Sequence, residues 1–522
     1  MTDHNDEMVA QVQDRVSQEA AALAEEPTKD IIDSKFITTC LYENAKGDAE
    51  LYAALYRDKF LYCKGMQEWF AWDDHHWRLD IMDESAVAVE EVAKKYLHEY
   101  FETSKKIAQL AADGAEKSEV KKLSDKSEKL AERARQLRAP NRREQCLKFV
   151  HTIKNPLAIS GTEFDQRPML FPCANGVIDL ETGKLLPGRP GDHLCAYSPI
   201  EYHGIDDEPE LWIRSLNEMH NCDGPDDDRS MVDYLQRLLG LAMTGHAYEK
   251  IFPIFYGKSG WNGRSLIIET ISAIMGTMAG PIPSEMLLSQ KFAKSSSGPS
   301  PDIMSLKGLR MAFAAETDEN QRFSAAKIKW LTGNNELIGR WPNDKRPIRF
   351  KPTHTLFLET NYQPQAPAND RSFWERVHLI PFNISYVDRD PREPHERRAD
   401  LKLRDKIAVE YSKILGWLVR GCLLWQKDGL KPPQIVTEAT AKYRENEDMI
   451  GDFIDECCVK EPLAKERGSN LYNRFVEWYH DNHGKNEPSG TWFGKQLGQK
   501  FEKNKSEGVI MYHGLRLPVL ET

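Results

Sequence analysis

The sequence predicts an α/β protein with a P-loop core, flanked by an N-terminal α+β domain and a C-terminal winged-helix domain. Three observations predict this: an apolar strand, glycine-rich loop and helix at 251–276, further apolar strands that end in polar residues, and a C-terminal order of helices followed by strands. A chain of 522 residues is too long for one core. The predicted parts are an acidic tail at 1–35, the α+β domain at 36–215, the core at 216–445 and the winged-helix domain at 446–522.

The composition is that of an ordinary globular protein, with 40% hydrophobic and 29% charged residues. No apolar run is long enough to cross a membrane, and the N-terminus lacks the pattern of a signal peptide. Nine scattered cysteines form no C-x-x-C pair, which argues against a zinc site or a disulfide framework. We therefore expect a protein of the host cell cytoplasm with reduced thiols and no membrane partner.

The net charge of −11 is unfavourable for binding nucleic acid, but it is unevenly distributed. Residues 1–35 hold nine acids and three bases, so the rest of the chain is close to neutral for its size. Local basic patches therefore matter more than the total charge.

Three patterns organise the N-terminal domain. Aromatic residues at 64–77 predict a strand, a turn and a strand, with the acidic and histidine residues 73–76 at a solvated tip rather than on a metal. The Lys-, Glu- and Ala-rich stretch 104–145 predicts a long charged helix or helical hairpin interrupted near Gly114. Residues 175–184 predict a second β-hairpin.

The loop after the apolar strand at 251–256 is predicted to bind a nucleoside triphosphate. Its glycines let backbone N–H groups approach phosphate oxygens, and the helix that follows adds its positive N-terminal end. The Ser265 hydroxyl is placed to bind magnesium, so ATP and Mg²⁺ are the expected ligands. The loop residues expected to bind the nucleotide are Gly257, Gly260, Asn262, Gly263, Arg264 and Ser265.

This loop departs from the standard P-loop in two ways. Five residues separate Gly257 from Gly263 where the pattern has four, and Arg264 occupies the position of the phosphate-contacting lysine. Arginine is bulkier and planar, so ATP binding with slow hydrolysis is one expectation. Lys258 in the same loop is a candidate substitute for the lysine, and a plain surface glycine loop is the alternative interpretation.

Two later strands supply candidate catalytic groups. The strand at 309–315 ends in Glu316, expected to hold magnesium together with Ser265 and to polarise water, with Asp318 or Glu319 as a helper. The strand at 353–360 ends at Asn361, which is suited to sense the γ-phosphate or the attacking water.

An arginine and a basic hairpin complete the candidate site. Arg376 precedes another apolar strand and is expected to reach a nucleotide in a neighbouring subunit, the alternative being a surface salt bridge. The segment 340–351 holds five bases and one acid around a predicted turn, which suits a phosphodiester backbone, although a solvated hairpin remains the alternative. The residues expected to bind DNA are Lys329, Arg340, Lys345 and Arg346.

The C-terminal part has helix patterns at 470–479 and 492–501 and a strand pair at 509–518. This order is typical of a winged helix, and bases outnumber acids from Lys495 onward. A winged helix used only for protein contact is the alternative.

In the order of these segments the chain resembles the superfamily 3 helicases, in particular the helicase module of phage, plasmid and poxvirus primase-helicases. The resemblance rests on 260–263, on 298–310 leading to Glu316, on 329–333, and on 360–364 with 370–382, and it extends over about residues 45–520. It implies an AAA+-like core and a ring, expected to be a hexamer, with ATP between subunits. It assigns Glu316 as the acidic residue, Asn361 as the sensor, Arg376 as the arginine finger and the 340–351 hairpin as the element that tracks single-stranded DNA.

The resemblance favours an ATP-driven replicative DNA helicase of a phage or mobile genetic element. About 200 residues must hold the whole N-terminal region, so we expect no primase domain and a separate primase or polymerase as partner. The rival interpretation is a nucleotide-binding, poorly hydrolysing ring that acts as a replication initiator or scaffold. A third, a metabolic P-loop kinase, has no use for the basic hairpin.

Overall fold

The computed structural model divides the chain into two compact units, the first comprising residues up to 167 together with 186–197, and the second comprising 168–185 and 198 onward. The residues that it describes are 32–220, 229–247, 249–290, 298–315, 321–342, 347–483, 485, 487–506 and 509–518. Most of the predicted acidic tail therefore lies outside the described residues. Within the described residues, no helix is long and apolar enough to span a membrane.

The first unit is built from helices packed beside a small sheet. Its strands follow the order β3-β2-β1-β4, in which β1 pairs antiparallel with β2 and parallel with β4. The predicted strand, turn and strand at 64–77 are β2 and β3, with Asp74 in the turn at a φ of 51°. The helices are α2 (Ser34–Tyr42), α3 (Asn44–Tyr56), α4 (Glu84–Val87), α5 (Val89–Ala112), α6 (Lys117–Leu137) and α7 (Pro140–Val150), and the strands are β1 (Phe60–Cys63), β2 (Glu68–Asp73), β3 (His76–Leu79) and β4 (Ala158–Ile159).

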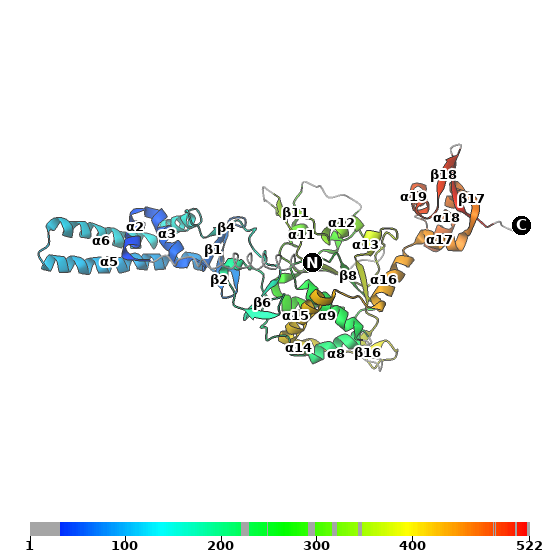
Figure 1. The fold of residues 1–522 in the computed structure, drawn as a ribbon, viewed down its shortest axis with the longest axis horizontal. Coiled ribbons are helices and arrows are strands. Elements are labelled where there is room, and N and C mark those ends of the chain that lie inside the picture. Colours follow the sequence, from blue (N-terminus) through cyan, green and yellow to red (C-terminus); the bar gives the residue numbers. More distant parts are fainter. Residues whose placement is uncertain are drawn as a thin grey trace, which may run out of the picture. The chain divides into compact units, whose positions relative to one another are not determined.

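The long charged segment forms a helical hairpin, as the sequence predicts. Helices α5 and α6 pack along each other and are drawn in cyan in Figure 1. Gly114 lies between them at a φ of 71°, a backbone conformation that favours glycine. Helix α5 begins at Val89, well before the charged stretch, because apolar residues of its first turns, including Val92 and Tyr96, are fully buried.

The second unit contains a five-stranded, entirely parallel sheet in the order β14-β8-β13-β10-β9. The fold is therefore mixed α/β with a parallel sheet, as predicted. Successive residues of the central strands are buried, so both faces of the sheet are covered, which is the usual pattern for a parallel sheet with helices on both sides. The strands are β8 (Phe252–Tyr256), β9 (Ala279–Ile282), β10 (Met311–Ala315), β13 (Thr355–Thr360) and β14 (Val377–Pro381).

One face of this sheet packs on a core that includes Phe252, Leu356 and Leu379 from three strands and Phe373 and Tyr443 from helices. On the other face, the ring of Phe255 lies 5.7 Å from that of Phe357. The helices of this region are α8 (Glu210–Met219), α9 (Ser230–Ala242), α10 (Arg264–Met275), α11 (Pro301–Met304), α12 (Ala325–Leu331), α13 (Arg371–Trp374), α14 (Leu403–Ala408), α15 (Tyr411–Asp428) and α16 (Gln434–Asn446).

Helices α9 and α15 cross at a point where both carry a glycine. A Cβ on Gly240 would lie 2.2 Å from the backbone nitrogen of Cys422, and one on Gly421 would lie 2.0 Å from the carbonyl oxygen of Gln236. The two backbones therefore touch, and a side chain at either position would force them apart.

Smaller sheets complete the middle of the chain. Residues 175–184 form the predicted β-hairpin, within a three-stranded sheet of order β5-β6-β7. The basic segment contains β12, which pairs antiparallel with β11, the strand directly before the segment. The strands are β5 (Leu170–Cys173), β6 (Gly176–Asp179), β7 (Lys184–Leu186), β11 (Leu337–Gly339), β12 (Ile348–Phe350), β15 (Ser385–Val387) and β16 (Glu396–Arg398).

The C-terminal part has the order helix, strand, helix, helix, strand, strand. The predicted strand pair within 509–518 is wrong in detail, because these residues form one strand, β19, at the centre of a sheet of order β17-β19-β18. Strand β17 was not predicted from the sequence because it is charged, contains Pro462 and is largely exposed. The elements are α17 (Met449–Cys457), β17 (Val459–Arg467), α18 (Gly468–His483), α19 (Gly490–Lys500), β18 (Lys503–Ser506) and β19 (Val509–Arg516).

Candidate functional site

The loop between β8 and α10 is held in shape by two glycines. Gly263 caps α10 at a φ of 90°, and a Cβ there would lie 2.5 Å from the sulfur of Met219. A Cβ on Gly257 would lie 2.1 Å from the side-chain nitrogen of Asn262. Gly260 has no atom within 4 Å of such a position, so packing requires glycine at only two of the three predicted positions.

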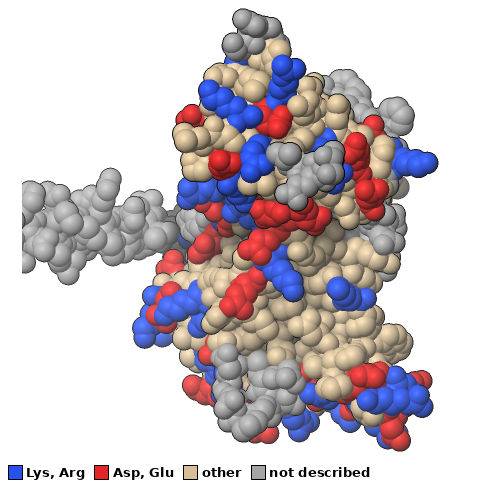
Figure 2. Space-filling view, turned by 90° about the vertical axis from the view of Figure 1, so that its right-hand side faces the viewer, with Lys and Arg blue, Asp and Glu red and all other residues tan. Residues whose placement is uncertain are grey.

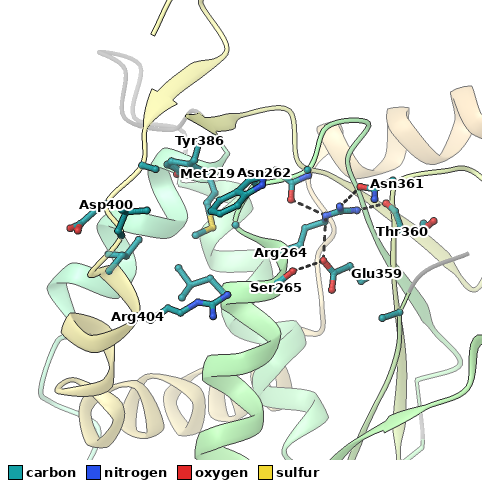
Figure 3. A pocket seen from close by; sticks show the side chains of 18 of the residues that line it. Met219, Asn262, Arg264, Ser265, Glu359, Thr360, Asn361, Tyr386, Asp400 and Arg404 are labelled. Atoms are coloured by element: carbon teal, nitrogen blue, oxygen red, sulfur yellow. Dashed lines mark hydrogen bonds and ion pairs between the residues drawn. The ribbon is translucent and has the colours of Figure 1, made fainter. Parts of the chain in front are cut away.

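A pocket of about 840 Å³ opens where this loop meets the end of β13, at the carboxyl ends of the parallel strands (Figure 3). Such ends are where α/β sheets generally hold their ligands. The pocket is lined by Met219, Gly260, Trp261, Asn262, Gly263, Arg264, Ser265, Leu266, Ala315, Glu359, Thr360, Asn361, Tyr362, Tyr386, Ala399, Asp400, Leu401, Leu403 and Arg404.

The pocket brings together five of the six predicted loop residues, with Gly257 as the exception, and the predicted sensor Asn361. Glu316, Asp318, Lys345 and Arg346 lie outside the described residues. Ala315, the residue before Glu316 and the last of β10, lines the pocket.

Arg264 turns into the protein and joins the loop to the sheet. Its Nε donates to the side-chain oxygen of Asn262 at 2.9 Å, and its Nη1 donates to the carbonyl oxygens of Phe255, at 3.3 Å, and Thr360. Its Nη2 donates to the side-chain oxygen of Asn361 (Figure 3). The arginine at the lysine position is thus hydrogen-bonded to the residue predicted to sense the γ-phosphate.

Burial lowers the pKa of the Arg264 guanidinium, and the nearby carboxylate of Glu359 opposes this effect. The side chain is 4% exposed, and its Nε lies 3.7 Å from the Glu359 carboxylate. A guanidinium stays charged in proteins, so Arg264 places a fixed positive charge at the base of the pocket.

Glu359 is a site residue that the sequence analysis missed. The Ser265 hydroxyl donates to its carboxylate at 2.9 Å, and both side chains line the pocket. Glu359 could have been predicted from the alternation of side chains along a strand. Glu359 and Asn361 are two residues apart, so their side chains lie on the same side of the chain. Only Asn361, which follows the end of the strand, was predicted as a site residue here.

A hydroxyl and a carboxylate side by side are oxygen donors of the kind that bind Mg²⁺. Ser265 and Glu359 therefore fit one side of a magnesium site, which would be completed by phosphate oxygens and water. Among the described residues, no group of three or more His, Cys, Asp or Glu residues forms a metal site by itself.

The remaining predicted residues do not line the pocket. The Nη1 of Arg376 donates to the carbonyl oxygen of Ser372, one helical turn earlier. Lys329 on α12 forms an ion pair of 2.7 Å with Asp370. Burial raises the pKa of Asp370, but hydrogen bonds from Lys329, Ser372 and the Phe373 backbone outweigh it, and the net pKa is below its usual value.

Arg340 follows β11 at the start of the basic hairpin. Its backbone N–H donates to the Ser300 hydroxyl at 3.1 Å, and its carbonyl accepts from the Ser300 N–H at 2.9 Å. These two bonds fix the backbone at the base of the hairpin.

Comparison with known proteins gives three findings. Residues 49–221 match the family model described as "D5 N terminal like". The chain is 28% identical over 330 residues to "Putative helicase L207/L206" of Acanthamoeba polyphaga mimivirus, covering 61% of this chain and 34% of that protein. It is 22% identical over 396 residues to "Putative helicase 022R" of Frog virus 3, covering 63% of this chain and 40% of that protein.

The chain thus spans roughly a third of the length of the curated relatives it matches. Among solved structures, it is similar to the apo C-terminal region of NrS-1, with 11% identity, a TM-score of 0.45, and coverage of 90% of this chain and 99% of that one. The resemblance predicted from the sequence is confirmed: the chain carries a D5 N-terminal-like region and is similar to viral proteins named as helicases.

Proposed function

We propose that this chain, which is similar to viral proteins named as helicases, is an ATP-dependent DNA helicase that serves replication of a phage or other mobile genetic element. In this proposal it acts in the host cell cytoplasm as a ring of identical subunits, a hexamer, that moves on single-stranded DNA. A separate primase or polymerase would supply priming.

One observation carries the proposal: the glycine loop, a serine–glutamate pair and an asparagine meet in one pocket at the carboxyl ends of a parallel sheet. The loop precedes the N-terminus of α10, a helix of 12 residues whose free N–H groups favour phosphate. Strand β8, which leads into the glycine loop, lies between β13 and β14. Side chains at the ends of these neighbouring strands therefore lie close to the loop.

The proposed roles follow from this placement. Backbone N–H groups around Gly263 bind the phosphates, and Ser265 and Glu359 hold Mg²⁺. Glu316 follows the pocket-lining Ala315 in the chain, and we propose that it polarises the attacking water, with Asp318 as a helper.

Asn361 is proposed to sense the γ-phosphate. It is hydrogen-bonded to Arg264, so displacement of one side chain changes the bonding of the other. Arg376 is proposed to act on the nucleotide of a neighbouring subunit, which agrees with its position away from its own pocket.

DNA contact is proposed for two elements. The hairpin of β11 and β12 carries Lys345 and Arg346 between its strands, with Arg340 at its base, and Lys329 would assist. The C-terminal part, residues 446–522, is proposed to be a DNA-binding winged helix, based on its order of helices and strands. Basic and acidic side chains alternate over the face shown in Figure 2, so DNA binding would depend on such local elements rather than on overall charge.

A second candidate function is a ring that binds ATP but hydrolyses it poorly. The hydrogen bonds of Arg264 favour this second function. The guanidinium already has four partners within the protein, and contact with a phosphate would require it to break some of these bonds. The two candidates differ in ATP turnover, not in ATP binding.

The deciding experiment measures ATP hydrolysis and strand displacement by the full chain, with and without single-stranded or forked DNA. The helicase proposal predicts DNA-stimulated hydrolysis and ATP-dependent displacement, both lost in Glu316→Gln while ATP binding persists. Ser259→Ala, an exposed change in the same loop, should leave both activities unchanged. Undetectable hydrolysis by the native chain that appears in Arg264→Lys would favour the non-hydrolysing ring, and displacement retained in Glu316→Gln would remove Glu316 from its role.

The DNA path is tested separately by a double change, Lys345→Ala with Arg346→Ala. Single-stranded DNA affinity should fall for all sequences, and the slope of log affinity against log salt should become shallower by about 1 to 2 units, because up to two phosphate contacts are lost. Lys184→Ala, an exposed lysine on β7, is the matched control. An unchanged slope in the double variant would place the DNA elsewhere.

A further inference from the structure

The nucleotide pocket has two chemically different ends. One end holds Arg264, Ser265, Glu359 and Asn361: hydrogen bonds join Arg264 to Asn361 and Ser265 to Glu359, and an ion pair of 3.7 Å joins Arg264 to Glu359 (Figure 3). The rest of the lining includes the large apolar and aromatic side chains Met219, Trp261, Tyr386, Leu401 and Leu403, and Figure 3 shows Met219 and Tyr386 across the pocket from Glu359 and Asn361. A phosphate chain requires only the first end.

Trp261 is the most unusual residue of the second end. Its side chain is 75% exposed, although tryptophan is generally well buried. Its φ is 57°, in the left-handed region that bulky side chains rarely adopt. Such backbone strain persists only where the surroundings enforce it.

The surroundings of Trp261 do enforce it. Its carbonyl oxygen accepts a hydrogen bond of 2.7 Å from the backbone N–H of Tyr386, the middle residue of β15. The next residue, Asn262, is 3% exposed and bonds both Ser259 and Arg264. The backbone that carries the indole is thus anchored at the pocket edge by the bond to its own carbonyl oxygen and by the side-chain bonds of the next residue.

We propose that Trp261 is a stacking platform for the nucleobase, and that Met219, Tyr386 and Leu401 complete the base site. The proposal rests on the proposed function, since it assumes that phosphates occupy the loop. A flat base would cover exposed aromatic surface, and stacking on an aromatic side chain holds a base whatever its sequence identity.

The charged side chains at this end already have partners. Arg404 pairs with Glu269 at 3.0 Å, and Asp400 pairs with Lys406 at 2.5 Å. Recognition would therefore depend on stacking area more than on hydrogen bonds to base edges. Every base has a stacking face, and purines offer a larger one than pyrimidines, so the site should bind ATP and GTP with similar affinity and CTP more weakly.

Calorimetric titration of the full chain with the magnesium complexes of ATP, GTP, CTP and inorganic tripolyphosphate tests this proposal. Trp261→Ala should weaken ATP binding about tenfold, within the range that stacking allows, and leave tripolyphosphate binding unchanged. Trp261→Phe should restore most of the ATP affinity. Phe101→Ala removes an aromatic side chain of α5 that is 57% exposed and does not line the pocket, and should leave both affinities unchanged.

A second variant separates the side chain from the backbone conformation. Asparagine tolerates the left-handed region, so Trp261→Asn removes the ring while keeping the loop shape, and it should match Trp261→Ala. Equal weakening of ATP and tripolyphosphate in both variants would show that Trp261 shapes the phosphate loop, and unchanged ATP affinity would place the base elsewhere. Either result overturns the base site while the proposed function stands. If the native chain bound neither ATP nor tripolyphosphate, both the base site and the proposed function would be overturned.

Discussion

Arg133 and Arg264 are buried to a similar extent, with 8% and 4% of their surface exposed, yet they bond in different ways. Arg133, in the first unit, donates to the fully buried carboxylate of Asp48 at 2.8 Å. Arg142 and Tyr96 donate to the same carboxylate at 2.8 and 3.0 Å. This is a buried charge surrounded by fixed donors.

Arg264, in the second unit, bonds mainly to neutral groups, and its carboxylate neighbour Glu359 is 3.7 Å away. It lines a pocket, and two of its neighbours, Asn361 and Glu359, line the same pocket. A ligand could take over some of these partners, whereas nothing from solvent can replace Arg133 on the buried Asp48. Burial alone therefore does not separate an arginine of the core from one that lines a pocket, but the partners do.

The largest expected effect is on the Asp48 network. Asp48→Ala leaves the buried Arg133 and the half-buried Arg142 without their shared carboxylate, so the first unit should lose about 3–5 kcal/mol of unfolding free energy. Hydrogen exchange of peptides from α3, α5 and α6 in a urea series measures this, because a chain of two units need not unfold in one step. The exposed Asp125→Asn on α6 is the control, and a loss below about 1 kcal/mol in Asp48→Ala would remove the distinction between the two sites.

Arg264→Ala should destabilise the second unit less, by about 1–3 kcal/mol, because it leaves carbonyl and amide oxygens without a donor, whereas Asp48→Ala leaves charged guanidinium groups without their carboxylate. Exchange of peptides from β8 and β13 without nucleotide measures the loss. The control is Lys258→Ala, an exposed lysine in the same loop, which should change stability by less than about 0.5 kcal/mol. A loss as large as that of Asp48→Ala would make Arg264 a core residue like Arg133.

These two sites also show what the sequence could predict. The β8 strand, the loop and α10 were predictable because an apolar run, glycines and a helix pattern are close in the chain. The partners of Arg264 were not, because Thr360 and Asn361 lie 96 and 97 residues further on, and only the strand order brings them beside the loop. Glu359 could have been found from strand alternation, whereas charged, exposed β17 gave no local signal.

A smaller effect is expected at Glu359. Glu359→Gln can still accept the hydrogen bond from Ser265 but loses the negative charge, so MgATP affinity should fall about tenfold while ATP without magnesium binds as before. Titrations with and without Mg²⁺ measure the difference. Glu375→Gln, an exposed glutamate paired with Arg371, is the control. Equal losses with and without magnesium would remove Glu359 from the metal site.

The most direct test of the central claim, that the pocket beside Arg264 binds a nucleoside triphosphate, is hydrogen exchange of the full chain with and without MgATP. The account predicts slower exchange in peptides covering 257–266 and 359–362, and no change in the peptides around Asp48, Arg133 and Arg142. Unchanged exchange in the loop at saturating MgATP, or protection confined to the first unit, would contradict it.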